Sequence, residues 1–115
     1  MLEENVRKSQ DALIQPKIGS LIILITEFHE ILYKAAGSPK LSAILHGLGG
    51  EAFINRCLAV KIEGVYEDFV AQHARLADAL RLKDKSLVSE IMRVHLEEGK
   101  RCALQILQKD LSLSL

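Results

Sequence analysis

Apolar residues recur along most of the chain at spacings of three and four, which is the spacing of one face of an α-helix. The strongest such segment runs from residue 18 to residue 36. One face of this segment carries Leu21, Leu24, Ile25, Phe28, Ile31, Leu32 and Ala35. Ile22 and Ile23 add apolar side chains on the other side, so the pattern predicts a helix buried on more than one face.

Glycine, serine and proline then mark a corner between this helix and the next one. Gly37 suits the left-handed position that ends a helix, Ser38 can cap the following helix, and Pro39 fits its first turn. The helical period continues from Leu41 until the glycine pair at residues 49–50. That pair either ends the helix or permits close packing, because glycine costs about 1 kcal/mol in a helix relative to alanine.

The second half of the chain predicts a helical hairpin. One helix is expected from Tyr66 to Leu82, and the other from Ser86 to about Gln108, with Asp84 in the turn as the N-cap. At the ends, residues 1–16 show only weak periodicity before Pro16, and residues 110–115 lack helical signals and are expected to fray. The whole pattern predicts an all-α antiparallel helical bundle, forming a single domain over residues 1–115.

Composition narrows the possible partners. The 115 residues contain 15 basic and 15 acidic side chains, so no basic excess favours binding to nucleic acid or to an anionic membrane. The longest aliphatic run, residues 21–25, is far shorter than the roughly 20 residues of a membrane span. Cys57 and Cys102 have no metal-binding spacing, and we interpret both as reduced core thiols of a cytoplasmic protein.

Histidines are the main candidates for chemistry. His73 and His95 lie on the apolar stripes of the two hairpin helices, each eleven residues from Asp84. Residues equidistant from the turn of an antiparallel hairpin lie level with each other, here about 16 Å from the turn. We therefore expect the two imidazoles to face each other or a shared cavity, and His29 can also point inward from its own helix.

Two interpretations of these histidines remain open at this point. Three inward imidazoles on three helices have the chemistry of a metal site, with open positions for water or a ligand. Alternatively, each is a separate core histidine that is hydrogen-bonded to a neighbour. His46, which precedes Gly47, is expected at the surface or at a helix cap.

Three ordered motifs carry a resemblance to a known family. They are FHEIL at residues 28–32 followed by AGSPKL at 36–41, then QHARLADAL at 72–80, and MRVHLE at 92–97. In order and spacing the chain resembles, over about residues 18–108, the FCD effector-binding domain of GntR-type transcription regulators of the FadR subfamily. The resemblance implies an all-α bundle that binds a small effector, often an organic acid.

The resemblance also implies a set of site residues. Many members hold a divalent metal with one aspartate and three histidines, which correspond here to His29, His73 and His95, whereas Ile25 stands at the aspartate position. The three histidines could still hold a metal such as Zn or Ni, with water or an effector carboxylate completing the shell. Otherwise they bind an acid without metal, through their N–H groups. Gln72 replaces the acidic residue that the family usually has before the second histidine.

Arg56 is the candidate for binding the carboxylate of the ligand, because a guanidinium can hold a carboxylate through two hydrogen bonds. The alternative for Arg56 is an ordinary surface arginine.

Architecture limits what this chain is expected to do by itself. Complete regulators of this type place a winged-helix DNA-binding domain ahead of the bundle, and residues 1–17 are too few to form one. DNA would therefore be reached only through a domain absent from this chain. The apolar stretch at residues 21–25 is expected to lack its usual cover, which a second copy in a homodimer could supply.

The sequence is compatible with three functions. The preferred one is a ligand-sensing domain that binds a small organic acid between its helices, with or without a divalent metal. The alternative is a structural or oligomerisation module that has lost sensing. An enzyme ranks last, because the sequence offers neither a paired general base nor a nucleophile motif, and we expect no catalytic activity.

Overall fold

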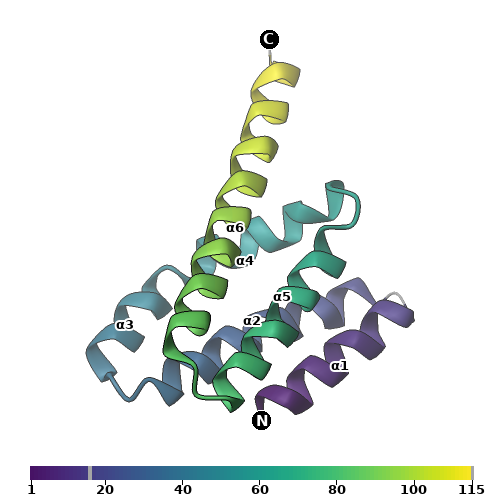
Figure 1. The fold of residues 1–115 in the computed structure, drawn as a ribbon. Helices are drawn as coiled ribbons and strands as arrows, with labels where there is room; N and C mark the ends of the chain where they lie inside the picture. The colour runs from purple at the N-terminus through teal and green to yellow at the C-terminus, as the bar shows by residue number, and fades with distance from the viewer. Residues whose placement is uncertain (16, 115) are drawn as a thin grey trace. The chain divides into compact units, whose positions relative to one another are not determined.

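A computed structural model of the chain describes residues 1–15 and 17–114, with the backbone alone described for 110–114. The described residues form six α-helices and one short 3₁₀ helix, and no strand occurs among them (Figure 1). This confirms the all-α expectation. The chain divides into two units, Met1–Cys57 and Leu58–Leu115, which are described separately below.

The first unit is built on two antiparallel helices that lie side by side, α1 (Leu2–Ile14) and α2 (Ile18–Ala35) (Figure 1). Its buried apolar side chains are Val6, Ala12, Leu21, Ile22, Ile25 and Phe28. The expectation that residues 21–25 lack cover is therefore wrong. The weakly periodic N-terminal residues form a helix that packs on α2, and within the stretch Ile23 is the exposed member.

Two polar side chains are part of the buried face of α1. Asn5 is buried, and its Nδ2 donates to the carbonyl oxygen of Leu24 at 2.9 Å. Ser9, also buried, donates from its hydroxyl to the carbonyl of Asn5 at 2.9 Å. Buried polar groups are tolerated when they are hydrogen-bonded in this way. These two residues explain why the apolar periodicity of α1 is weak although its inner face is buried.

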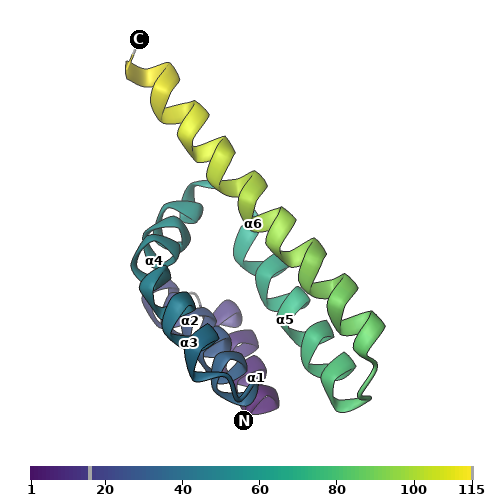
Figure 2. The ribbon, with the colours of Figure 1, turned by 90° about the vertical axis from the view of Figure 1, so that its left-hand side faces the viewer.

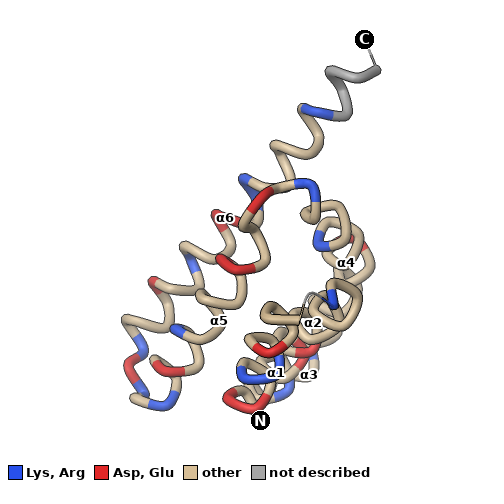
Figure 3. Tube along the Cα trace, turned by 90° about the vertical axis from the view of Figure 1, so that its right-hand side faces the viewer, with Lys and Arg blue, Asp and Glu red and all other residues tan. Residues whose placement is uncertain are grey.

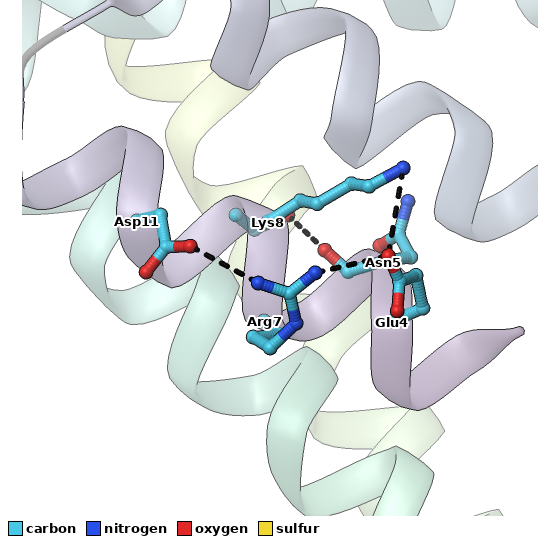
Figure 4. Close-up of polar contacts among 6 residues, drawn as sticks. Glu4, Asn5, Arg7, Lys8 and Asp11 are labelled. Atoms are coloured by element: carbon cyan, nitrogen blue, oxygen red, sulfur yellow. Dashed lines mark hydrogen bonds and ion pairs between the residues drawn. The ribbon is translucent and has the colours of Figure 1, made fainter.

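The solvent side of α1 carries ion pairs between successive turns (Figure 4). Arg7 lies 2.9 Å from Glu4 and 3.4 Å from Asp11, and Lys8 lies 3.8 Å from Glu4. All of these side chains are exposed. Exposed helical pairs at these spacings contribute about 0.3–0.5 kcal/mol each, so they favour the helix without determining the fold.

The corner after α2 has the structure that its residues predict. Gly37 adopts a φ of 68°, in the left-handed region, and α3 (Pro39–Gly47) follows with proline in its first turn. The Ser38 hydroxyl accepts a hydrogen bond from the backbone N–H of Leu41 at 3.3 Å.

The glycine pair at 49–50 begins a separate helix, α4 (Gly49–Leu58), after a break at Leu48. A methyl group at Gly49 or Gly50 would meet no atom within 4 Å. Close packing is therefore not the reason for these glycines, and the break is their structural effect.

The second unit is a helical hairpin preceded by a 3₁₀ turn, η1 (Ala59–Lys61). Its helices are α5 (Val65–Arg81) and α6 (Lys85–Ser114), which pack antiparallel, and α6 continues well past the start of α5 (Figure 2). The carboxylate of Asp84 accepts from the backbone N–H of Leu87 at 3.0 Å, which confirms the predicted cap. The expected end of this helix near Gln108 is wrong, because the backbone stays helical through Ser114. Of the tail 110–115 that is expected to fray, residues 110–114 are thus helical, and Leu115 lies outside the described residues.

Charged residues of both signs are interspersed along the two units, consistent with the net charge of zero (Figure 3). Among the described residues, no helix combines the length and the apolar character that crossing a bilayer requires.

Candidate metal and ligand site

Two buried histidines meet inside the α5–α6 hairpin. The Nε2 atoms of His73 and His95 lie 3.3 Å apart, and their ring centroids are separated by 4.9 Å. His73 is 1% exposed and His95 is 8% exposed. The contact agrees with the equal spacing of the two residues from the Asp84 turn.

Apolar packing fixes the level at which the two rings meet. Phe69, one helical turn before His73, presents its ring edge-on to His95 at a centroid distance of 6.1 Å. Leu76 and Ile91 are buried on the facing stripes of the same two helices. The imidazoles are therefore surrounded by side chains that exclude water, where a hydrogen bond or a metal bond is stronger than in solvent.

Gln72 contacts the opposite side of the His95 ring. Its Oε1 lies 2.5 Å from Nδ1 of His95. An amide oxygen can only accept a hydrogen bond, so Nδ1 of His95 carries a proton and donates it to Gln72. In the neutral imidazole this leaves a lone pair on Nε2, which is the atom that faces His73.

The separation of the two Nε2 atoms suits a metal ion. Two nitrogens bound to a tetrahedral metal at about 2.0–2.1 Å each lie about 3.3–3.4 Å apart. The distance between His73 and His95 is 3.3 Å, which agrees with this spacing and also with a direct hydrogen bond between the two rings. His29 is the third histidine of the expected set.

His29 belongs to α2 in the first unit, where it is buried. Its ring lies edge-on to Phe28, with centroids 5.9 Å apart, and 6.3 Å from the ring of Tyr33. One turn earlier on α2, Ile25 is 1% exposed. The position that would carry a carboxylate ligand is thus filled by a fully buried aliphatic side chain, and any metal bound here would lack that negative charge.

Arg56 lies on α4 and is half-buried. Its Nη1 donates to the hydroxyl of Thr26 on α2 at 3.1 Å. Burial lowers the pKa of Arg56, while neighbouring Tyr33 and Glu30 act in the opposite direction. A guanidinium held away from bulk water is well suited to pair with a ligand carboxylate.

Tyr33 connects this arginine with His29. The Tyr33 ring lies next to the His29 ring. Burial raises the pKa of Tyr33, and the positive charge of nearby Arg56 lowers it in part. Within the first unit, the side of α2 that carries His29 therefore also has a phenol and a guanidinium close by.

The remaining candidates are in surface or structural positions. His46 is at the surface as expected, and its Nε2 lies 2.8 Å from a carboxylate oxygen of Glu30. Both cysteines are free thiols; Cys102 is buried as expected of a core residue, whereas Cys57 is only half-buried. Burial raises the pKa of the Cys102 thiol, which argues against a reactive role.

Gln72 and Tyr33 were not among the site residues expected from the sequence. Gln72 directly precedes His73, so its closeness to the pair could have been foreseen, but its contact with the far side of His95 depends on the side-chain conformation. Tyr33 is one turn after His29, and that spacing was the available signal.

Comparison with known proteins gives one match. The family model described as the FCD domain matches residues 1–98 of this chain, which include all three buried histidines and Arg56. No curated protein and no solved structure matches it.

Proposed function

The chain belongs to the FCD domain family, and on that premise we propose that it is the effector-binding module of a GntR-type transcription regulator. The observation that carries the proposal is the buried pair of His73 and His95, whose Nε2 atoms have the spacing of two metal ligands. Aliphatic side chains could supply nearly all of the packing that two buried, facing imidazoles provide. A ligand-binding role accounts for them better than a role in the core alone.

In this proposal a divalent metal such as Zn or Ni is held by His29, His73 and His95. Three neutral imidazoles leave a coordination position open, as in sites that exchange ligands. A bound divalent ion would supply positive charge and an open position to the carboxylate of an acid. Since Ile25 offers no carboxylate of its own, the acid would be the natural counter-charge at this site.

The effector is proposed to be a small organic acid, with Arg56 binding a carboxylate. The half-buried position of Arg56 and the placement of Tyr33 beside His29 support this role. We propose a sensing role without catalytic activity, because the FCD domain is a regulatory domain family.

Binding of the effector would favour the conformation of the module that binds it best. In a complete regulator such a change would be passed to a winged-helix domain and its operator, with the effector-binding modules acting as a homodimer.

Thermal melts with added Zn²⁺, Ni²⁺ and a panel of mono- and dicarboxylic acids test this proposal. A ligand at 100 times its Kd stabilises the folded state by about 2.7 kcal/mol. We expect stabilisation by metal, further stabilisation when an acid is added, and loss of the acid effect in Arg56→Met. No shift with any metal or acid would contradict the proposal.

A structural or oligomerisation module is the second candidate, and Ile25 is the observation that favours it. If the domain has lost sensing, a buried aliphatic residue such as Ile25 is expected at the position of the former metal ligand. This candidate predicts that His73→Ala and His95→Ala assemble normally and that no ligand alters the melt. An exclusively monomeric chain by sedimentation would contradict it.

A further inference from the structure

We infer that Gln72 is a positioning residue that fixes the tautomer of His95, so that His95 is ready to bind a metal and His73 is the histidine that rearranges. The inference rests on the proposed metal site for its functional meaning. Its structural part concerns only the α5–α6 hairpin and can be tested without metal.

The hydrogen bonds around His95 determine where its proton lies. Gln72 Oε1 is 2.5 Å from Nδ1 and accepts the proton there. The lone pair of the neutral ring is then on Nε2, which lies 3.3 Å from Nε2 of His73. Because two bare nitrogens would repel each other, the proton between them belongs to His73, whose Nε2–H donates to His95.

The two histidines are therefore not equivalent. His95 already has an unprotonated Nε2, because its proton is held on Nδ1 by Gln72. For His73 to bind through the same Nε2, its Nε2–H bond must break, the lone pair of that nitrogen must go to the metal, and a proton must be added at Nδ1. The ring stays neutral, and no proton is released overall.

The chemistry of Gln72 also affects the strength of the site. A histidine ligand whose second nitrogen donates to a hydrogen-bond acceptor is a better ligand, and loss of such a partner typically reduces metal affinity 10- to 100-fold. An amide accepts this hydrogen bond without adding charge. A carboxylate at position 72 would make the His95 ring more basic and would add a negative charge. With Gln72 the site stays neutral, and its metal affinity is lower than it would be with a glutamate.

Nitrogen-15 NMR of the imidazole rings tests the inference. The metal-free protein is measured at about pH 8, above the ordinary imidazole pKa of about 6.5. We expect the Nδ1–H form for His95 and the Nε2–H form for His73. In Gln72→Leu the His95 preference should be lost, whereas Gln105→Leu, an exposed glutamine on α6, should leave it unchanged. An Nε2–H form of His95 in the unaltered protein, or an unchanged His95 in Gln72→Leu, would overturn the inference.

Metal affinity gives the second readout. On adding Zn²⁺, His73 should change to the Nδ1–H form while His95 keeps its form. The Kd should rise about 10-fold or more in Gln72→Leu and fall in Gln72→Glu. A His95 that changes form while His73 does not would also overturn the inference. If no metal binds, the proposed metal site fails, and the metal-free spectra still decide the role of Gln72.

Discussion

Phe28 and Phe53 are the same side chain in very different surroundings. Phe28 on α2 is 0% exposed, whereas Phe53 on α4 is 41% exposed. Phe28 also lies edge-on to His29, so it supports both the core of the first unit and a proposed ligand.

Replacing Phe28 by alanine should therefore be far more costly than the same change at Phe53. We expect Phe28→Ala to lower the free energy of unfolding by about 3–5 kcal/mol, because it removes a fully buried ring and leaves a cavity. Phe53→Ala should cost about 1 kcal/mol or less. Urea denaturation of both variants measures the difference, and equal losses would show that the burial of Phe28 does not govern stability.

The two cysteines should differ in reactivity with pH. Burial raises the pKa of Cys102, so its thiolate is scarce at neutral pH, and the thiolate is the form that reacts. Thiol labelling should show a slow phase that is lost in Cys102→Ala, kept in Cys57→Ala, and still accelerating above pH 9. A Cys102 labelling rate that levels off below pH 9 would disagree with the buried position.

For individual residues, the sequence predicted the part of the site that depends on the backbone alone. The meeting of His73 and His95 follows from equal spacing about a turn, which depends only on the backbone. The contact of Gln72 with His95, and the packing of Tyr33 beside His29, depend on side-chain conformations that periodicity does not determine.

The helices themselves are defined mostly by their ends. Asp84 begins α6 by accepting from the N–H of Leu87, and Ser38 does the same for α3 with Leu41. Lys83, in the hairpin turn, adopts a φ of 56°, a region that few residues other than glycine enter. The turn that sets His73 level with His95 thus depends on a small number of local interactions.

Removing the cap of α6 should destabilise the hairpin measurably. Asp84→Ala is expected to cost about 1 kcal/mol, since it leaves the N–H of Leu87 without its acceptor. Asp84→Asn keeps an acceptor oxygen and should cost only a few tenths. Thermal unfolding of the two variants tests this, and an alanine variant as stable as the asparagine variant would contradict the capping role.

Two element boundaries differed from expectation for physical reasons. The inner face of α1 includes Asn5 and Ser9, which form hydrogen bonds within the first unit. A count of apolar residues therefore gives too weak a helical signal for α1. The expected end of α6 was too early because residues 110–115 alternate leucine with serine or aspartate and lack the apolar spacing of a helix. No glycine or proline follows Gly99, however, and nothing in the sequence ends the backbone hydrogen bonding there.

For the whole molecule, the sequence predicted the helical class and the family, and the FCD match over residues 1–98 confirms both. The match begins at residue 1, earlier than the resemblance expected from about residue 18, and so includes α1. The spacing of the apolar residues could not decide whether the histidines are metal ligands or separate core residues, because both roles give the same apolar pattern. The 3.3 Å separation within the hairpin shows that the two rings contact each other, and it agrees both with a direct hydrogen bond and with two ligands of one metal.

Calorimetric titration with Zn²⁺ is the most direct test of the central claim, which is a metal site made by His29, His73 and His95. We expect one ion to bind per chain, with the affinity reduced at least 10-fold in His29→Ala and in His73→Ala and unchanged in the surface control His46→Ala. Absence of binding, or binding that His29→Ala and His73→Ala leave intact, would contradict the account.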